Sequence, residues 1–452
     1  MHAPLLSREE AHLMNRLNLH RSRLLLVSSL LLLLAGGSLW SGMSVRAAAL
    51  ARPRGKPTPT PTVTAPPTPT ATPSATATPT ATPAPVAGMW QVVPSPAIDV
   101  SNSTDGARLH AVAVVSASDV WAVGFGPQPG GPAYAKQTLI EHWDGSSWNI
   151  VPSPNLPSTY PEVELDGVVA LAANDVWAVG YGENPAIPLG SGSPADITLI
   201  EHWDGSSWSI VPSPNPDQDV NQLHAITGVA SNDLWAVGQR GVGGATCCPY
   251  ASLIEHWNGT SWSVAPNPGL TALQGVTDVA ANNVWAVGTP AAGGGDIIEH
   301  WDGTAWTGVS APIKNDVGGG IYLRAVTAVS ATDIWAVGDQ ENPEIGEGGT
   351  DYSVTEHWDG TAWTVVGLAL QNSTLGGVTA TGPANAWAVD ATGLMQTQHW
   401  DGATWSLFST PNPGTGSGLQ AVAAVSAGDI WAVGWTNTNG AYTPLIERFT
   451  QA

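Results

Sequence analysis

The chain has 452 residues, of which 36 are acidic and 14 basic, and its formal net charge is −22. Eight basic residues lie within the first 56 positions, so the chain from residue 88 onward carries six basic residues against 34 acidic ones. A nucleic-acid-binding surface needs clustered Lys and Arg to meet the phosphates. This composition therefore excludes nucleic acid as a partner, and it leaves the N-terminal segment as the only membrane contact that we expect.

The N-terminal region predicts export. Residues 1–23 form a basic tail, and residues 24–45 are an uncharged, mostly apolar stretch of 22 residues. As a helix this stretch would measure about 33 Å, enough to cross a bilayer, and the basic flank favours an N-terminus inside. The leucine-rich part, followed by alanines at 47–49, also fits a cleavable signal peptide. Both alternatives stay open, and both place the rest of the chain outside the cell, either on the plasma membrane or secreted.

Residues 46–87 are rich in alternating Pro, Thr and Ala. Such a composition cannot bury apolar surface and favours extended, polyproline-like chain. We therefore predict a disordered linker that holds residues 88–452 away from the membrane.

Residues 88–452 consist of repeats spaced 44 to 58 residues apart. The first block, LHAVAVVSASDVWAVG in its first copy, begins at Leu109, Leu165, Leu223, Leu273, Leu323, Leu375 and Leu419. A second block of the type EHWDGSSWSIVPSPN follows each of the first six copies. A period near 50 residues with strand-like units is typical of a propeller or a solenoid.

Each repeat divides into four short strands, which we name a to d: LHAVAVV, VWAVG, TLIEHW and WSIVP. The seventh repeat ends after strand c, whereas residues 89–96 match strand d and precede the first repeat. The N-terminal strand can therefore complete the last sheet and close a ring, which hides the sheet edges. The prediction is an all-β, seven-bladed propeller of four-stranded antiparallel blades.

The order VWAVG then HWDGSSW resembles the kelch family of propeller repeats over residues 88–452. Two features depart from the kelch pattern: a single Gly follows strand b, replaced by Asp390 in the sixth repeat, and the two aromatics of the second block lie closer together. The resemblance implies the propeller fold but no particular function, because propellers of this kind host unrelated functions.

Most repeated Trp and His residues are expected to be structural. The Trp residues would pack between blades, where each removes about 150–250 Å² from water. Six His residues share one place on strand c, and ring symmetry keeps them too far apart for one metal: His142, His202, His256, His300, His357 and His399. Each preceding Glu is expected to hydrogen-bond its His or a turn amide.

Function is predicted on the rim formed by the d–a and b–c loops, because these loops vary between repeats whereas the a–b and c–d turns are uniform. The second residue of strand a is polar and varied there: His110, Asp166, His224, Gln274, Arg324, Gly376 and Gln420. The residue after WAVG adds aromatics from the neighbouring blades one, two and seven: Phe125, Tyr181 and Trp435. Aromatic faces beside polar groups suit a sugar ring.

Two other features of the sequence are candidate sites. Carboxylates in and beside the fifth b–c loop could bind Ca²⁺, although no EF-hand pattern is present: Asp339, Glu341, Glu344, Glu347 and Asp351. Cys247 and Cys248 are adjacent, and an exported chain favours a vicinal disulfide even though the bridge would be strained. We expect no other cofactor.

The combined prediction is a monomeric, non-enzymatic module that binds a protein or a glycan through the variable rim, with no assigned catalytic residue. The alternative is a glycan-active enzyme, a hydrolase or lyase, at the channel mouth. A hydrolase needs two carboxylates about 5–10 Å apart, and Asp166 with a rim Glu is the only pair that the sequence suggests.

Overall fold

The computed structural model describes residues 88–157, 161–188, 194–241, 250–269, 271–290, 298–310, 320–340, 352–367 and 372–451. The predicted tail, apolar segment and linker, residues 1–87, lie outside these ranges. Within the ranges, all regular elements are strands, and none is a helix long and apolar enough to span a membrane.

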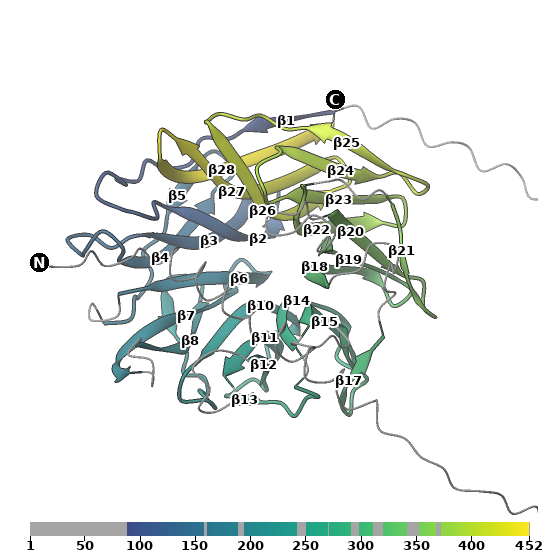
Figure 1. The fold of residues 1–452 in the computed structure, drawn as a ribbon, viewed down its shortest axis with the longest axis horizontal. Helices are drawn as coiled ribbons and strands as arrows, with labels where there is room; N and C mark the ends of the chain where they lie inside the picture. The colour runs from purple at the N-terminus through teal and green to yellow at the C-terminus, as the bar shows by residue number, and fades with distance from the viewer. Residues whose placement is uncertain are drawn as a thin grey trace, which may run out of the picture. The chain divides into compact units, whose positions relative to one another are not determined.

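The strands form seven four-stranded antiparallel sheets arranged as blades around a central axis, as predicted (Figure 1). The a strands, which face the axis, are β2 (Arg108–Ser116), β6 (Val163–Ala172), β10 (Asn221–Ala230), β14 (Thr271–Ala280), β18 (Ile321–Ser330), β22 (Leu375–Gly382) and β26 (Gly416–Ser426). The b strands are β3 (Asp119–Pro127), β7 (Asp175–Pro188), β11 (Asp233–Gly241), β15 (Asn283–Pro290), β19 (Asp333–Gln340), β23 (Asn385–Asp390) and β27 (Asp429–Thr438).

The outer half of each blade consists of strands c and d. The c strands are β4 (Lys136–Trp143), β8 (Pro194–Trp203), β12 (Tyr250–Trp257), β16 (Ile298–Trp301), β20 (Tyr352–Trp358), β24 (Gln396–Trp400) and β28 (Ala441–Gln451). The d strands are β5 (Trp148–Ile150), β9 (Trp208–Ile210), β13 (Trp262–Val264), β17 (Trp306–Val309), β21 (Trp363–Val365), β25 (Trp405–Ser409) and β1 (Gly88–Val92).

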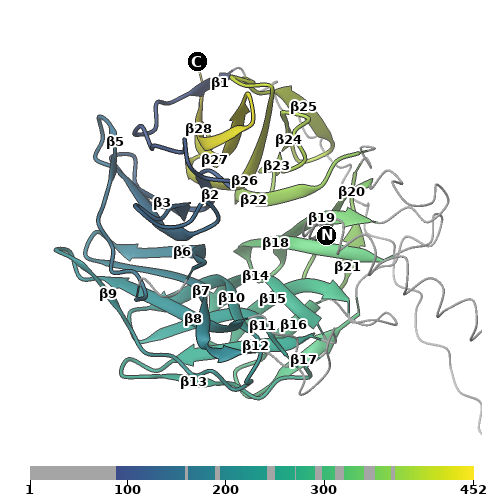
Figure 2. The same cartoon turned by 60° about the vertical axis from the view of Figure 1, so that its left-hand side comes forward.

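The last blade is assembled from both ends of the described chain. β1 pairs antiparallel with β28, with Trp90 opposite Phe449, and completes the sheet β1-β28-β27-β26. The same blade packs against the first one, because Trp431 lies 5.1 Å from Trp143 between ring centroids. Figure 2 shows β26 beside β2 at this junction.

Tryptophans join each blade to the next. Trp121 on β3 is 1% exposed and meets Trp203 and Trp208 of the second blade at centroid distances of 5.2 and 5.5 Å. The same trio recurs at five other junctions, for example with Trp285 against Trp358 and Trp363. At the remaining junction Trp387 meets Trp90 and Phe449. The separations and tilted or edge-on angles are those at which aromatic pairs attract one another. The Trp excess is thus explained by packing between blades.

The strand-c histidines form a second repeated unit. The His142 ring stacks on Trp121 at 4.1 Å and its Nε2 lies 2.8 Å from Asp119 Oδ1 at the start of β3. In the last blade Arg448 takes this place, with its guanidinium 4.7 Å from the Trp431 ring and bound to Asp429. These residues are structural, as expected.

The glutamates that precede the histidines do not hydrogen-bond them, which corrects that expectation. Alternation along strand c sends His and Glu to opposite faces of the blade, and the Glu side chain enters the packed layer between blades. Glu141 accepts a hydrogen bond from Ser95 Oγ at 2.9 Å, and Glu299 accepts one from Ser252 Oγ at 2.7 Å.

Candidate functional site

A β-bulge brings the varied residue of strand a into the channel. In each blade the pairing of strands a and b shifts by one residue directly after the first Leu of the repeat, for example between Leu109 and Ala111. The residue that the shift leaves unpaired is the polar, varied one: His110, Asp166, His224, Gln274, Arg324, Gly376 and Gln420. Bulges commonly re-aim one side chain beside a functional site.

In six blades the Gly that ends VWAVG lets strands a and b approach closely at this bulge. A Cβ built on Gly124 would lie 2.0 Å from the backbone oxygen of Arg108, and one on Gly288 would lie 2.1 Å from that of Ala272. A side chain at this place therefore requires a local shift of the backbone; in the sixth blade Asp390 stands here, paired with Leu375, and the bulge is kept. In six blades this repeated glycine is the sequence signal of the close approach between the strands; the bulge itself was not predicted.

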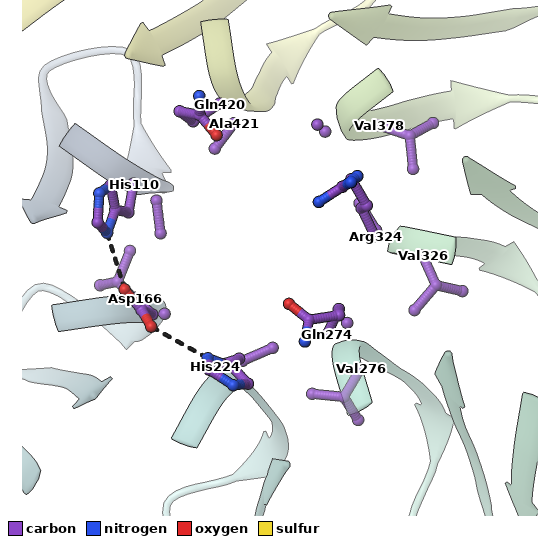
Figure 3. A pocket seen from close by; sticks show the side chains of 18 of the residues that line it. His110, Asp166, His224, Gln274, Val276, Arg324, Val326, Val378, Gln420 and Ala421 are labelled. Atoms are coloured by element: carbon purple, nitrogen blue, oxygen red, sulfur yellow. Dashed lines mark hydrogen bonds and ion pairs between the residues drawn. The ribbon is translucent and has the colours of Figure 1, made fainter. Parts of the chain in front are cut away.

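All seven bulge residues line one cavity of about 170 Å³ at the centre of the ring (Figure 3). The aliphatic residues two positions further along six of these strands also border the cavity, and most of them are buried in the layers between blades: Val168, Ile226, Val276, Val326, Val378 and Val422. The structure thus gathers four of the predicted site residues, His110, Asp166, His224 and Arg324, around one space.

Asp166 lies between two histidines on one side of the cavity. Its two carboxylate oxygens lie 2.7 Å from His110 Nδ1 and 3.1 Å from His224 Nδ1, as the dashed lines in Figure 3 show. Burial alone would raise the pKa of Asp166, but the two hydrogen bonds outweigh it and hold this pKa well below its usual range. Burial also opposes the charge of His110, yet Asp166 raises the pKa of that imidazole above its usual value.

The opposite side of the cavity carries a positive charge. Arg324 projects toward the centre (Figure 3), and its Nε donates a hydrogen bond to Asp339 Oδ1 at 2.7 Å. The Asp339 side chain is only 5% exposed whereas that of Arg324 is 42% exposed. The carboxylates of Asp166 and Asp339 are both held by cationic or hydrogen-bonding partners, so no acidic group faces the cavity unpaired among the described residues.

The three predicted aromatics do not form one open platform. Phe125 is 4% exposed, with its ring beneath Lys136 Nζ at 4.6 Å. The Tyr181 hydroxyl donates a hydrogen bond to Glu164, and burial followed by this carboxylate raises its pKa far above the usual value. Trp435 packs edge-on against Tyr442 at 5.3 Å. Phe125 in particular has no face to offer a sugar.

An ionic cluster beside the cavity was not predicted. Lys136 Nζ lies 3.3 Å from Glu164 and 3.5 Å from Glu162. Burial opposes its charge, but the two carboxylates raise the pKa of Lys136 above its usual value. The cluster joins strand c of blade one to blade two. Comparing equivalent positions of the repeats does not predict such a contact, because its residues occupy different positions in two repeats.

The other predicted sites fall largely outside the described ranges. Of the five carboxylates in the fifth blade, only Asp339 is described, and it pairs with Arg324. Cys247 and Cys248 lie outside the described residues. Within the described part of the chain, no group of three or more His, Cys, Asp or Glu side chains is arranged to hold a metal ion.

No protein-family model and no curated protein matches the chain. Among solved structures, YCF48 bound to D1 peptide matches with 15% identity and a TM-score of 0.50, over 82% of this chain and 100% of that one. YCF48 from Cyanidioschyzon merolae matches with 14% identity and a TM-score of 0.45, over 80% and 98%. An ulvan lyase, a polysaccharide lyase, matches with 9% identity and a TM-score of 0.46, over 81% and 94%. At these identities the similarity extends to the fold and not to the activity.

Proposed function

We propose that this chain is an exported, surface-tethered binding module of kelch-like architecture, which holds a protein or glycan ligand at the central cavity on its variable-loop face. One observation carries the proposal. Seven equivalent positions in a closely repeated framework hold different, mostly polar residues, and all seven line the same cavity. Packing does not require that variety, because the bulge takes these residues out of the pairing between strands.

Their placement suits recognition. The cavity offers imidazole, carboxylate, amide and guanidinium groups in one ring, and sites of this kind fix a ligand through a few convergent polar groups above apolar walls. YCF48, which has a similar fold, is found with a bound peptide, so peptides are tested together with glycans.

The test is binding of the full chain, purified in mild detergent, to arrays of glycans and peptides. We expect saturable binding that His110→Ala or Gln274→Ala weakens at least tenfold. Gln91→Ala is the control. Gln91 is exposed on β1, the outermost strand of the last blade, and its substitution should leave binding unchanged. Binding that survives both cavity substitutions would refute the placement of the site.

A glycan-active enzyme is the second candidate, favoured by the His110–Asp166 contact. A histidine oriented by a buried carboxylate is the usual form of a general base. Asp166 is, however, the only carboxylate among the described residues that line the cavity, whereas hydrolysis calls for two. Cleavage of a polysaccharide that Asp166→Asn abolishes would establish the enzyme.

Export is tested separately. Protease added to intact cells should digest the propeller if residues 24–45 place it outside. The mass of the mature chain then distinguishes the anchor from a signal peptide cleaved near residues 47–49.

A further inference from the structure

We infer that the central cavity recognises a single sugar ring that carries a carboxylate, with Arg324 as the residue that selects the acidic sugar. The inference rests on the proposed binding function and specifies its ligand. It is carried by the charge, the size and the polar lining of the cavity.

The cavity lining places a guanidinium inside a strongly acidic domain. The propeller is strongly acidic, yet the only carboxylate in the described lining, Asp166, is occupied by two imidazoles. Arg324 is the one permanently cationic residue of that lining. Asp339 offsets part of the Arg324 charge, so an anionic group is favoured only where it contacts the guanidinium directly, and the acidic surroundings repel anions that make no such contact.

Arg324 is oriented for a carboxylate. Asp339 binds its Nε from a buried position and so fixes the plane of the guanidinium. The two terminal nitrogens have no partner among the described residues and lie on the side of the cavity (Figure 3). A guanidinium in this state can donate two parallel hydrogen bonds to a carboxylate, an arrangement that is stronger and more selective than a contact with a neutral hydroxyl.

The size and lining favour a sugar over a peptide end. An engineered cavity of about 150 Å³ takes up one benzene molecule, so 170 Å³ accommodates one ring-sized group. Gln274, Gln420 and the histidines surround that space with donors and acceptors. A sugar ring has several hydroxyls to satisfy them, whereas a peptide terminus with an apolar side chain would leave most of them without partners, which is unfavourable.

The experiment compares two probes on the full chain in mild detergent. One is an oligosaccharide that ends in glucuronic acid, and the other is the same oligosaccharide with that carboxyl reduced to the alcohol. By isothermal titration calorimetry we expect the acidic probe to bind roughly ten- to a hundredfold more tightly, the range typical of a charge-assisted pair of hydrogen bonds. Arg324→Gln should remove this preference.

A charge-matched pair of variants guards against misfolding of the Arg324 variant. Gln420→Glu adds a carboxylate to the lining without changing the size of the side chain and should weaken only the acidic probe. Gln91→Glu adds the same charge on exposed β1 and should leave both affinities unchanged. Both variants are first shown to unfold at the wild-type temperature.

The outcomes separate the two proposals. If the probes bind equally, and His110→Ala but not Arg324→Gln weakens both, the acidic sugar is refuted and the binding cavity stands. If neither probe binds but a peptide does, and amidation of its C-terminus abolishes binding, the ligand is a peptide carboxylate and the sugar is refuted. If no probe and no array ligand binds, both proposals fail.

Discussion

Replacing one buried glutamate should make the propeller less sensitive to alkaline pH. Six strand-c glutamates are fully buried: Glu141, Glu201, Glu255, Glu299, Glu356 and Glu447. Burial raises the pKa of Glu356 from 4.5 to about 8, because an ionised carboxylate loses its hydration there and finds no hydrogen-bond partner among the described residues. The sixth blade has a neutral amide, Gln398, at the equivalent place in the strand register.

The sign and size of the effect of Glu356 on stability follow from proton linkage. Between about pH 4.5 and 8 the unfolded chain releases the Glu356 proton while the folded chain keeps it, so the free energy of unfolding falls as the pH rises and levels off above 8. One pKa unit corresponds to about 1.4 kcal/mol, so the full shift sets an upper limit of about 5 kcal/mol for this residue. Glu356→Gln removes the titrating group, so it should also remove the part of the pH-dependent fall in unfolding free energy that Glu356 causes.

The assay is urea unfolding of the full chain in detergent at pH 5 and pH 8.5, followed by tryptophan fluorescence. We expect Glu356→Gln to be close to wild type at pH 5 and more stable by at least about 1 kcal/mol at pH 8.5. Gln398→Glu is the converse control and should lose stability only at pH 8.5. Asp166 raises the pKa of His110 above its usual value, so His110 also contributes to the pH dependence, and only the difference from wild type reports on Glu356. An equal shift at both pH values would refute the reasoning.

Three further predictions concern packing, the bulge and the cavity. Trp285→Ala should lower the free energy of unfolding by about 3–5 kcal/mol, because this 3% exposed ring fills the space between two blades, and an unchanged melting temperature would contradict that role. Gly288→Ala should cost about 1–3 kcal/mol, whereas Gly382→Ala, with open space around the new Cβ, should be near neutral in the same melt. Asp166→Asn should lower the pKa of His110 in an NMR titration, and an unmoved pKa would show that Asp166 does not hold the imidazole charge.

The fold could be predicted because the same pattern of strands and turns recurs in seven repeats of the sequence. One copy of LHAVAVV is ambiguous between a strand and a buried helix, but seven copies with uniform turns leave one interpretation. The missing seventh strand d and the matching segment at Trp90 also predict the pairing that β1 and β28 make. Repeats reveal the features that every blade shares, and the four strands with their turns are such features.

The site was harder to predict from the sequence than the fold, because its contacts join residues that differ from one repeat to the next. The repeat frame singled out His110 and Asp166 as exceptions, but their hydrogen bond joins residues 56 positions apart. The Arg324–Asp339 pair crosses from strand a to strand b at a place where only the fifth blade has both charges. The glutamates were misassigned because sequence neighbours on a strand point to opposite faces.

The bulge explains how a tightly packed ring can also carry a variable site. A strand-a residue in regular pairing would alternate between the two neighbouring blades, and changing it would cost packing energy. The bulged residue is outside that alternation, so His, Asp, Gln or Arg can occupy it without disturbing a neighbour. The constraint that the bulge imposes falls on strand b, where the residue beside the bulge is Gly in six blades. The sixth blade departs at both places, with Asp390 in strand b and Gly376 at the bulge. The Asp390 carboxylate accepts a hydrogen bond from Ser373 Oγ at 2.6 Å. A Cβ at residue 376 would lie 2.9 Å from the backbone oxygen of Gln420 and 3.0 Å from the Cβ of Ala391, so glycine at the bulge of this blade is explained by the close approach of its neighbours.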